Sequence, residues 1–238
     1  MNMRMTSVAR RETGANGERG FTLVELLVAT MVTMLVLGGA VALTSQIQTG
    51  YRRQVELAAA EQEGRYALEW IGKLIRSSGN NPFSVAQTNC PGVFPDPVPM
   101  DVMAIRFDPN ANDEDDDIRL QTDANPPDGI VGGVALGACN QANEDVTISF
   151  DPENSAIVFF DNNLAPVASI RTDAVIQDLR FVYRDALHAV MDTADPMTNP
   201  ANVRYVETQI TIRTRTLDPA TGQPVTRVIS SEVRVRAL

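Results

Sequence analysis

Lysine and histidine are almost absent from this chain of 238 residues, in which Lys73 and His188 are the only examples of each. Acidic residues outnumber basic ones by 30 to 20, so the formal net charge is −10. A protein that holds nucleic acid through a basic face needs clustered lysine and arginine to meet the phosphates. The composition therefore excludes that class of binding.

Catalytic and metal-binding signatures are missing as well. The single histidine and two widely spaced cysteines, Cys90 and Cys139, cannot supply a His/Cys zinc set. His188 has no nucleophile beside it in a recognisable motif, and neither a phosphate-cradling glycine loop nor a nucleophile elbow occurs. We therefore predict a non-enzymatic protein with no required cofactor, in which His188 is a surface or loop residue.

One long apolar run extends from Phe21 to Leu43, contains no proline and is interrupted by a single acid, Glu25. At about 1.5 Å per residue, a helix of this length spans roughly 35 Å, enough to cross a hydrocarbon core about 30 Å thick. The preceding residues 1–20 carry more arginine than acid, so this flank should stay cytoplasmic while the rest is exported. An uncleaved signal anchor and a processed segment both fit this hydropathy.

The residues at the start of the run favour processing. An ordinary secretory signal is cut after its apolar segment, whereas here the cuttable glycine, Gly20, lies before it. The string Arg19-Gly20-Phe21-Thr22-Leu23-Val24-Glu25 resembles the class III signal of type IV prepilins and type II secretion pseudopilins. The resemblance implies that a prepilin peptidase cleaves after Gly20, removes residues 1–20 as a leader peptide and methylates Phe21. It also implies that Glu25 is the fifth-position glutamate of the family.

Glu25 is costly inside a membrane helix unless its carboxylate has a partner. The new ammonium group at Phe21 supplies one, either within the chain or, as the resemblance implies, on a neighbouring subunit. Such a pair would set the axial register between helices that otherwise present uniform apolar surfaces. The alternative is an interfacial acid that snorkels to the membrane surface.

Residues 44–79 should continue the membrane-spanning helix of residues 21–43 as an amphipathic segment. Gly79 suits a left-handed position just after the helix, and Gly38-Gly39 is the expected weak point. We interpret Tyr66 and Trp70, one turn apart, as packing residues. The apolar stripe consists of Ala67, Leu68, Ile71, Leu74 and Ile75.

Three strings in this second half narrow the resemblance to PilW-type minor pilins, with pseudopilin J of type II secretion as a less close match. The remainder of the chain is similar to these families only in its layout. The strings are Tyr51-Arg52-Arg53-Gln54, Glu63-Gly64-Arg65-Tyr66-Ala67-Leu68-Glu69 and Leu74-Ile75-Arg76.

Residues 80–238 should form a β-rich periplasmic head. Together with the long helix packed on an antiparallel sheet, this gives an α+β fold of the type IV pilin kind. Residues 217–224 close a hairpin and residues 184–200 form a loop. Short apolar runs between turn signals predict strands at Val102–Phe107, Val146–Phe150, Ala156–Phe160, Ala174–Tyr183, Val203–Thr216 and Val225–Arg236.

Two further features concern ligands and cross-links. The oxygen-bearing side chains of Asp108, Asn110, Asn112 and Asp116 are spaced like the start of a calcium loop, but Arg119 stands where the bidentate glutamate belongs. A calcium site and a solvated acidic hairpin loop are the two interpretations. Export to an oxidising compartment predicts that Cys90 and Cys139 form a disulfide.

These observations predict a minor pilin that acts in the priming or tip complex of a type IV pilus. Its partners would be the prepilin peptidase, other minor and major pilins and the bacterial inner membrane, which it crosses once before entering a pilus or pseudopilus. A minor pseudopilin of type II secretion is the close alternative. A membrane-tethered periplasmic adhesion or binding module is the alternative from another class.

Overall fold

The computed structural model describes residues 20–82, 84, 102–110, 112, 114–123, 131, 142–163, 168–195, 197–219 and 221–235. The chain divides into two compact units, the first ending at Gly50 and the second beginning at Tyr51. Each unit is described by itself.

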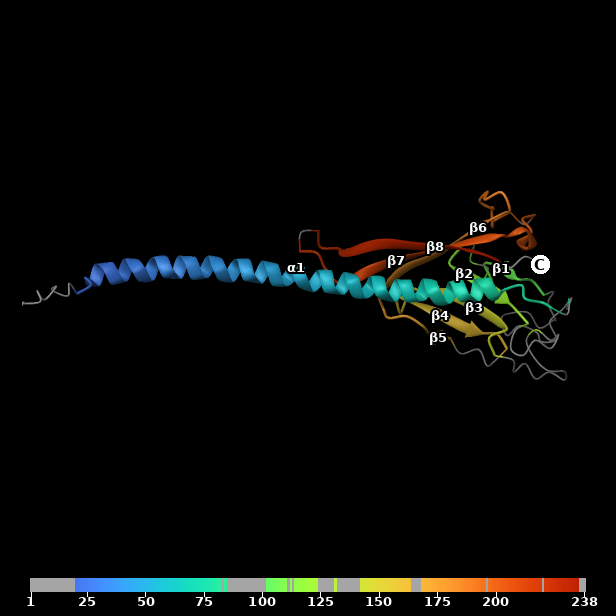
Figure 1. Ribbon diagram of the computed structural model, residues 1–238, viewed down its shortest axis with the longest axis horizontal. Helices are drawn as coiled ribbons and strands as arrows, with labels where there is room; N and C mark the ends of the chain where they lie inside the picture. The colour runs from blue at the N-terminus through green and yellow to red at the C-terminus, as the bar shows by residue number, and fades with distance from the viewer. Residues whose placement is uncertain are drawn as a thin grey trace, which may run out of the picture. The chain divides into compact units, whose positions relative to one another are not determined.

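A single helix, α1 (Leu23–Ser77), carries the chain from the first unit into the second (Figure 1). It runs without interruption through Gly38 and Gly39, which confirms the predicted continuous helix. Threonines in its first half return their hydroxyl hydrogen bonds to backbone carbonyls of the preceding turn, at 2.7 Å for Thr33 and 2.8 Å for Thr44. A polar side chain satisfied in this way does not need water, so it suits an apolar helix.

The end of α1 follows the predicted glycine stop. Gly79 has φ of +74°, the left-handed conformation expected there. The Ser78 amide donates to the Leu74 carbonyl at 2.9 Å, and the Ser78 hydroxyl donates to the Ile75 carbonyl at 2.7 Å. These bonds satisfy carbonyl groups that the last helical turn would otherwise leave open.

The head contains two antiparallel sheets, with five strands in one and three in the other. The five-stranded sheet has its strands in chain order: β1 (Ile105–Phe107), β2 (Asp117–Gln121), β3 (Asp145–Asp151), β4 (Ala156–Asp161) and β5 (Ser169–Ile170).

The three-stranded sheet consists of β6 (Ile176–Arg184), β7 (Tyr205–Leu217) and β8 (Pro224–Arg234). Along β7, Val206, Thr208, Ile210 and Ile212 are buried while the residues between them are partly exposed, which confirms the predicted alternation. A short 3-10 helix, η1 (Pro200–Asn202), begins at the last residue of the predicted loop 184–200 and precedes β7.

Two strands were missed by the sequence analysis. β2 was read as part of an acidic loop because its charged residues hide the apolar pair Ile118 and Leu120, and β5 is only two residues long. The first predicted strand, Val102–Phe107, is shorter than expected, because only Ile105–Phe107 pairs with β2. The other five predicted strands, which correspond to β3, β4, β6, β7 and β8, fall within a few residues of their predicted bounds.

The second half of α1 packs against both sheets, as Figure 1 shows. Ala67, Leu68, Ile71 and Ile75 are buried as predicted, and Trp70 makes an edge contact with Phe159 of β4, with ring centroids 6.4 Å apart. Tyr66 does not pack as predicted: it is 57% exposed. Within the described residues, the fold is α+β and pilin-like.

Candidate functional site

The junction at the start of α1 holds the residues of the predicted processing site. Gly20 and Phe21 precede the helix, and both are exposed. Thr22 is the N-cap residue of α1, because its side-chain oxygen accepts a hydrogen bond from the backbone amide of Glu25 at 3.2 Å. The spacing Thr22-x-x-Glu25 is that of a capping box. The sequence analysis missed this role of Thr22, although the pattern was available in the sequence.

Among the described residues of the first unit, the apolar surface that follows packs against no other element. Leu23, Leu35 and Val41 are 78%, 77% and 69% exposed, respectively. The helix is long and apolar enough to cross a membrane, with a mean hydropathy of 2.4 over its most apolar 18 residues, none of which is buried. Such a surface is stable only against lipid or against other apolar helices.

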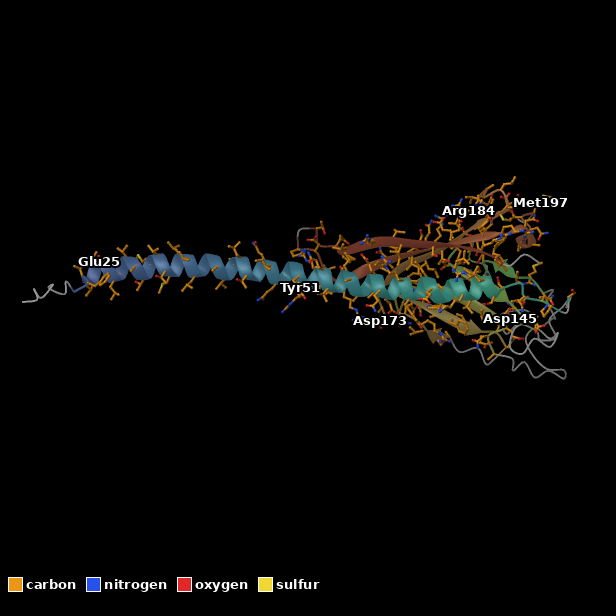
Figure 2. The ribbon with its side chains drawn as sticks, in the orientation of Figure 1. Glu25, Tyr51, Asp145, Asp173, Arg184 and Met197 are labelled. Carbon is orange, nitrogen blue, oxygen red and sulfur yellow. The ribbon has the colours of Figure 1, made fainter. Side chains whose placement is uncertain are left out.

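Glu25 lies in the first turn of this helix (Figure 2). Within the described part of the chain its carboxylate meets no cationic side chain. The ammonium group that cleavage would create at Phe21, in the same chain or in a neighbouring subunit, is the counter-ion expected from the sequence, and the assembly role of Glu25 stays a prediction.

The acidic loop between β1 and β2 is braced by its own side chains. The backbone amide of Asn112 donates to Asp108 Oδ1 at 3.0 Å and to Asn110 Oδ1 at 2.9 Å. The backbone amide of Glu114 donates to Asn112 Oδ1 at 2.9 Å, and the side-chain amide of Asn112 donates to Asp116 Oδ1 at 3.4 Å. Three of the four oxygens proposed for calcium thus already accept bonds from backbone amides in the loop.

No group of three or more His, Cys, Asp or Glu side chains is placed to hold a metal ion, as far as the described residues extend. Asn110 and Asn112, which are half of the predicted ligand set, are amides, and residues 111 and 113 lie outside the described part. Calcium binding by Asp108, Asn110, Asn112 and Asp116 therefore stays a prediction.

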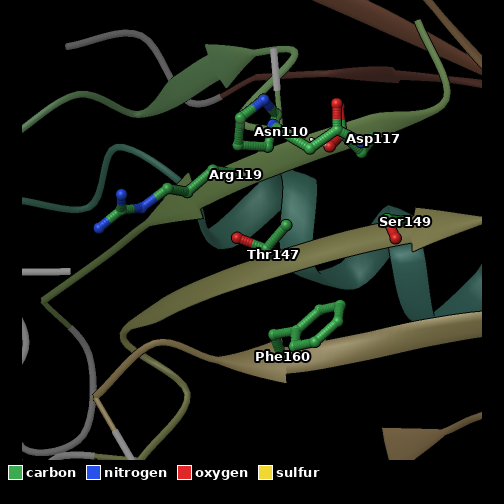
Figure 3. A pocket seen from close by; sticks show the side chains of 7 residues that line it. Asn110, Asp117, Arg119, Thr147, Ser149 and Phe160 are labelled. Carbon is green, nitrogen blue, oxygen red and sulfur yellow. Dashed lines mark hydrogen bonds between the residues drawn. The ribbon is translucent and has the colours of Figure 1, made fainter. Parts of the chain in front are cut away.

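A cavity of about 210 Å³ opens beside this loop, on the face of the five-stranded sheet that carries the polar residues of β2 and β3 (Figure 3). Asp117 lines it and is 1% exposed. One carboxylate oxygen, Oδ2, accepts from the Asn110 amide at 3.2 Å, whereas Oδ1 has no hydrogen-bond partner among the described residues. Burial, together with the nearby charges of Asp116 and Asp108, raises the pKa of Asp117 to about 7.

Asp117 should make the stability of the head depend on pH. Below about pH 4 the folded and unfolded chains both hold the proton, and above about pH 7 both have lost it. Between these values only the unfolded chain ionises, so the free energy of unfolding falls as pH rises. We expect a loss of about 2 kcal/mol, less than the full shift implies because the effective dielectric constant around a buried carboxylate is higher than that of a dry interior.

Replacing Asp117 by asparagine should abolish this loss, so the free energy of unfolding of the variant should be close to that of the wild type at about pH 3 and exceed it at about pH 8. Urea unfolding followed by the fluorescence of Trp70, the single tryptophan, measures the difference. Asp151→Asn is the matched control, because Asn154 lowers the pKa of the exposed Asp151 and the expected pH effect has the opposite sign. Equal pH profiles for Asp117→Asn and the wild type would contradict the assignment.

Beside the cavity lies a buried ion pair that the sequence analysis did not find. Arg119 donates from Nε and Nη2 to the two carboxylate oxygens of Asp145 at 2.7 and 2.6 Å, and the two side chains are 4% and 2% exposed. Gln121 and Asn162 donate to the same carboxylate at 2.9 and 2.8 Å. Arg119, which broke the calcium pattern in the sequence, therefore belongs to the sheet and not to the loop.

His188 lies in the loop after β6, as expected. Its ring stacks on Tyr205 with centroids 4.0 Å apart, and Nδ1 is 3.9 Å from a carboxylate oxygen of Glu232. Its φ of +61° is an uncommon backbone conformation for a residue other than glycine. These contacts are those of a loop residue held at the end of a sheet.

The predicted disulfide lies outside the described residues, since neither Cys90 nor Cys139 belongs to them. The bridge stays a prediction. Thiol counting on unreduced protein should find neither cysteine reactive.

Comparison with known proteins gives one match. A family model described as the prokaryotic N-terminal methylation motif matches residues 15–41. The motif contains Gly20, Phe21 and Glu25 and supports a type IV prepilin-like protein with a structural role. No curated protein and no solved structure matches the chain.

Proposed function

We propose that this protein is a minor pilin that takes part in the priming or tip complex of a type IV pilus. The observation that carries the proposal is an exposed apolar half-helix, most of which lies within an N-terminal methylation motif matched at residues 15–41. Before assembly that surface would be covered by the inner membrane, with the head in the periplasm. After cleavage by the prepilin peptidase it would be covered by the helices of other minor and major pilins.

The second half of α1 supports the minor class. The PilW-like string around Gly64 and Arg65 occupies a stretch where α1 approaches the three-stranded sheet closely, since a β-carbon at Gly64 would lie 3.0 Å from Ile212 Cγ2. A minor pseudopilin of type II secretion would share the methylation motif. Deleting the gene and measuring pilus number and protein secretion in the same strain separates the two: loss of pili with normal secretion supports the pilus assignment.

Cleavage after Gly20 is the first expected result. Replacing Gly20 with tryptophan should block the peptidase, because a bulky side chain would occupy the position immediately before the cut bond. The variant should keep about twenty extra residues by mass and be missing from purified filaments, while its membrane level stays normal. A Gly20→Trp variant that is trimmed normally would contradict the interpretation as a prepilin. Gly50→Trp is the control, since Gly50 lies in α1, beyond the cleavage signal.

Glu25→Ala should separate membrane insertion from assembly. Removing an intramembrane acid should leave insertion unchanged or improved, because a carboxylate costs on the order of 3 kcal/mol at the bilayer centre and less near the interface. Assembly should fall, because the ammonium group of a neighbouring Phe21 loses its counter-ion. Counting pili and measuring membrane levels in one strain tests both effects. Wild-type pilus numbers in Glu25→Ala would show that Glu25 is a tolerated interfacial acid. Glu25→Asp, which keeps the carboxylate, should retain part of the pilus assembly.

A further inference from the structure

We propose that the cavity beside β2 binds an alkylammonium group, with the buried carboxylate of Asp117 as its counter-ion. The site lies in the head and is independent of the methylation motif. It is bounded by the acidic loop and by one face of β2, β3 and β4 (Figure 3). Its lining consists of Pro109, Asn110, Asp117, Arg119, Thr147, Ser149 and Phe160.

Asp117 is the first reason. Burying a carboxylate oxygen without a hydrogen-bond donor is unfavourable by roughly 1–3 kcal/mol, and more if the group is charged. Asp117 Oδ1 is in this position, whereas Oδ2 is held by the Asn110 amide. A donor brought by a ligand would satisfy the unpartnered oxygen.

The charge of the site is the second reason. Among the described residues that line the cavity Arg119 is the one cation, but its guanidinium turns away from Asp117 and is neutralised by Asp145 at 2.6 and 2.7 Å (Figure 3). Asp116 and Asp108 add to the negative potential at Asp117. The cavity is therefore an anionic site, which favours a cation over a neutral polyol and disfavours an anion.

The shape and lining select the kind of cation. Calcium takes six to eight oxygen ligands. The described lining of this cavity offers one unpartnered carboxylate oxygen of Asp117 and the hydroxyl of Ser149, which is opposite Asp117 in the β2–β3 pair. The rest of the surface near them is apolar and comes from Pro109 and Phe160. An ammonium group can donate to Asp117 and Ser149 while its alkyl chain lies on the apolar side, where the ring of Phe160 also attracts a cation.

The volume agrees with such a ligand. An engineered apolar cavity of about 150 Å³ accepts benzene, so about 210 Å³ has room for a four-carbon chain with its ammonium head. That head and stem are the end of a lysine side chain. The ligand chemistry is shared by a free amine and by a lysine of another protein.

Titration of the full-length protein in detergent micelles at pH 8 with n-butylammonium chloride tests the proposal. We expect saturable movement of the side-chain carbon signal of Asp117 in NMR spectra of protein labelled at aspartate, against sodium chloride at equal ionic strength. The neutral isostere 1-butanol and calcium chloride should each produce no saturable shift. Asp117→Asn should weaken butylammonium binding at least about tenfold, which corresponds to about 1.4 kcal/mol, as monitored by the signals of neighbouring residues. Asp151→Asn should bind like the wild type.

A second arm distinguishes the two sources of the ammonium group. Nα-acetyl-lysine methylamide should bind as well as butylammonium if the cavity accepts a lysine side chain from a protein, and much more weakly if only free amines can enter. Either result is compatible with the site, whereas binding of neither compound overturns it. Equal binding by Asp117→Asn, or a response to calcium alone, also overturns it.

Ser149→Ala keeps the test decisive if Asp117→Asn does not fold, because it removes only a half-buried hydroxyl. We expect about threefold to tenfold weaker binding of butylammonium by this variant, in line with the loss of one hydrogen bond to a charged group. Unchanged binding by Ser149→Ala, combined with an unfolded Asp117→Asn, would count against the proposal.

Discussion

Asp145→Ala should destabilise the head by about 3–5 kcal/mol, the range measured when one member of a buried ion pair is removed. The reason lies in Arg119, which is 4% exposed and would keep its charge in the interior without the two carboxylate oxygens that now neutralise it. Gln121 and Asn162 would each lose an acceptor as well. Urea unfolding followed by Trp70 fluorescence should show a large fall in the midpoint.

A second variant separates the value of the pair from the cost of breaking it. Replacing both partners, with Arg119→Met and Asp145→Leu, should recover most of the lost stability, since well-packed apolar residues often match a buried ion pair. Glu69→Ala is the control, because the pair between Glu69 and Lys73 is exposed on α1 and its loss should leave the midpoint within error. A mild effect of Asp145→Ala alone would mean that water reaches Arg119.

The features of the chain that depend on regular spacing or on a single helix-ending residue could be predicted from the sequence. The apolar run from Phe21, the stripe from Ala67 to Ile75 and the stop at Gly79 are each encoded locally, by length, by spacing and by a single conformational preference. The alternation in β7 is also local, because one face is buried and the other is wet. In these segments local preference and tertiary packing agree, which is the condition for a correct prediction.

β2 could not be recognised for the opposite reason. All five of its residues are buried, including Asp117, Arg119 and Gln121, so the usual pattern of apolar inside and polar outside is absent. Asp145, which neutralises Arg119, is 26 positions away from it in the chain, and Asn162, which donates to the same carboxylate, is 17 positions beyond Asp145. Only the fold brings these side chains together. The cavity at Asp117 has the same origin, since its walls come from three strands and a loop.

The glycines of α1 show that a close contact between a helix and a sheet cannot be recognised from the sequence alone. A glycine inside a helix is normally unfavourable by about 1 kcal/mol relative to alanine, so Gly64 reads as a weak point. In the structure, a β-carbon at Gly64 would overlap Ile229 Cδ1 and lie 3.0 Å from Ile212 Cγ2. The missing side chain lets α1 approach β7 and β8 more closely than any other residue type would allow.

Gly64→Val should therefore destabilise the head by about 2–3 kcal/mol, the usual cost of overpacking a core. Gly64→Ala should destabilise the head by less than Gly64→Val. The higher helix propensity of alanine offsets about 1 kcal/mol, and the end of the Ile229 side chain can rotate away from the new β-carbon. Some loss remains because Ile212, on the other side, is fully buried and has little room to move.

Two other glycines of the same helix calibrate the effect in urea unfolding followed by Trp70. Gly72→Ala should fall between the others, since its β-carbon would lie 3.2 Å from Val233 Cγ2, and Gly50→Ala, with nothing within 4 Å, should be neutral or slightly stabilising. Adding Ile229→Val removes the overlapping methyl group, so the double variant with Gly64→Ala should regain stability relative to Gly64→Ala. If alanine at Gly64 behaves like alanine at Gly50, and Ile229→Val brings no recovery, then α1 does not depend on Gly64 to reach the sheet.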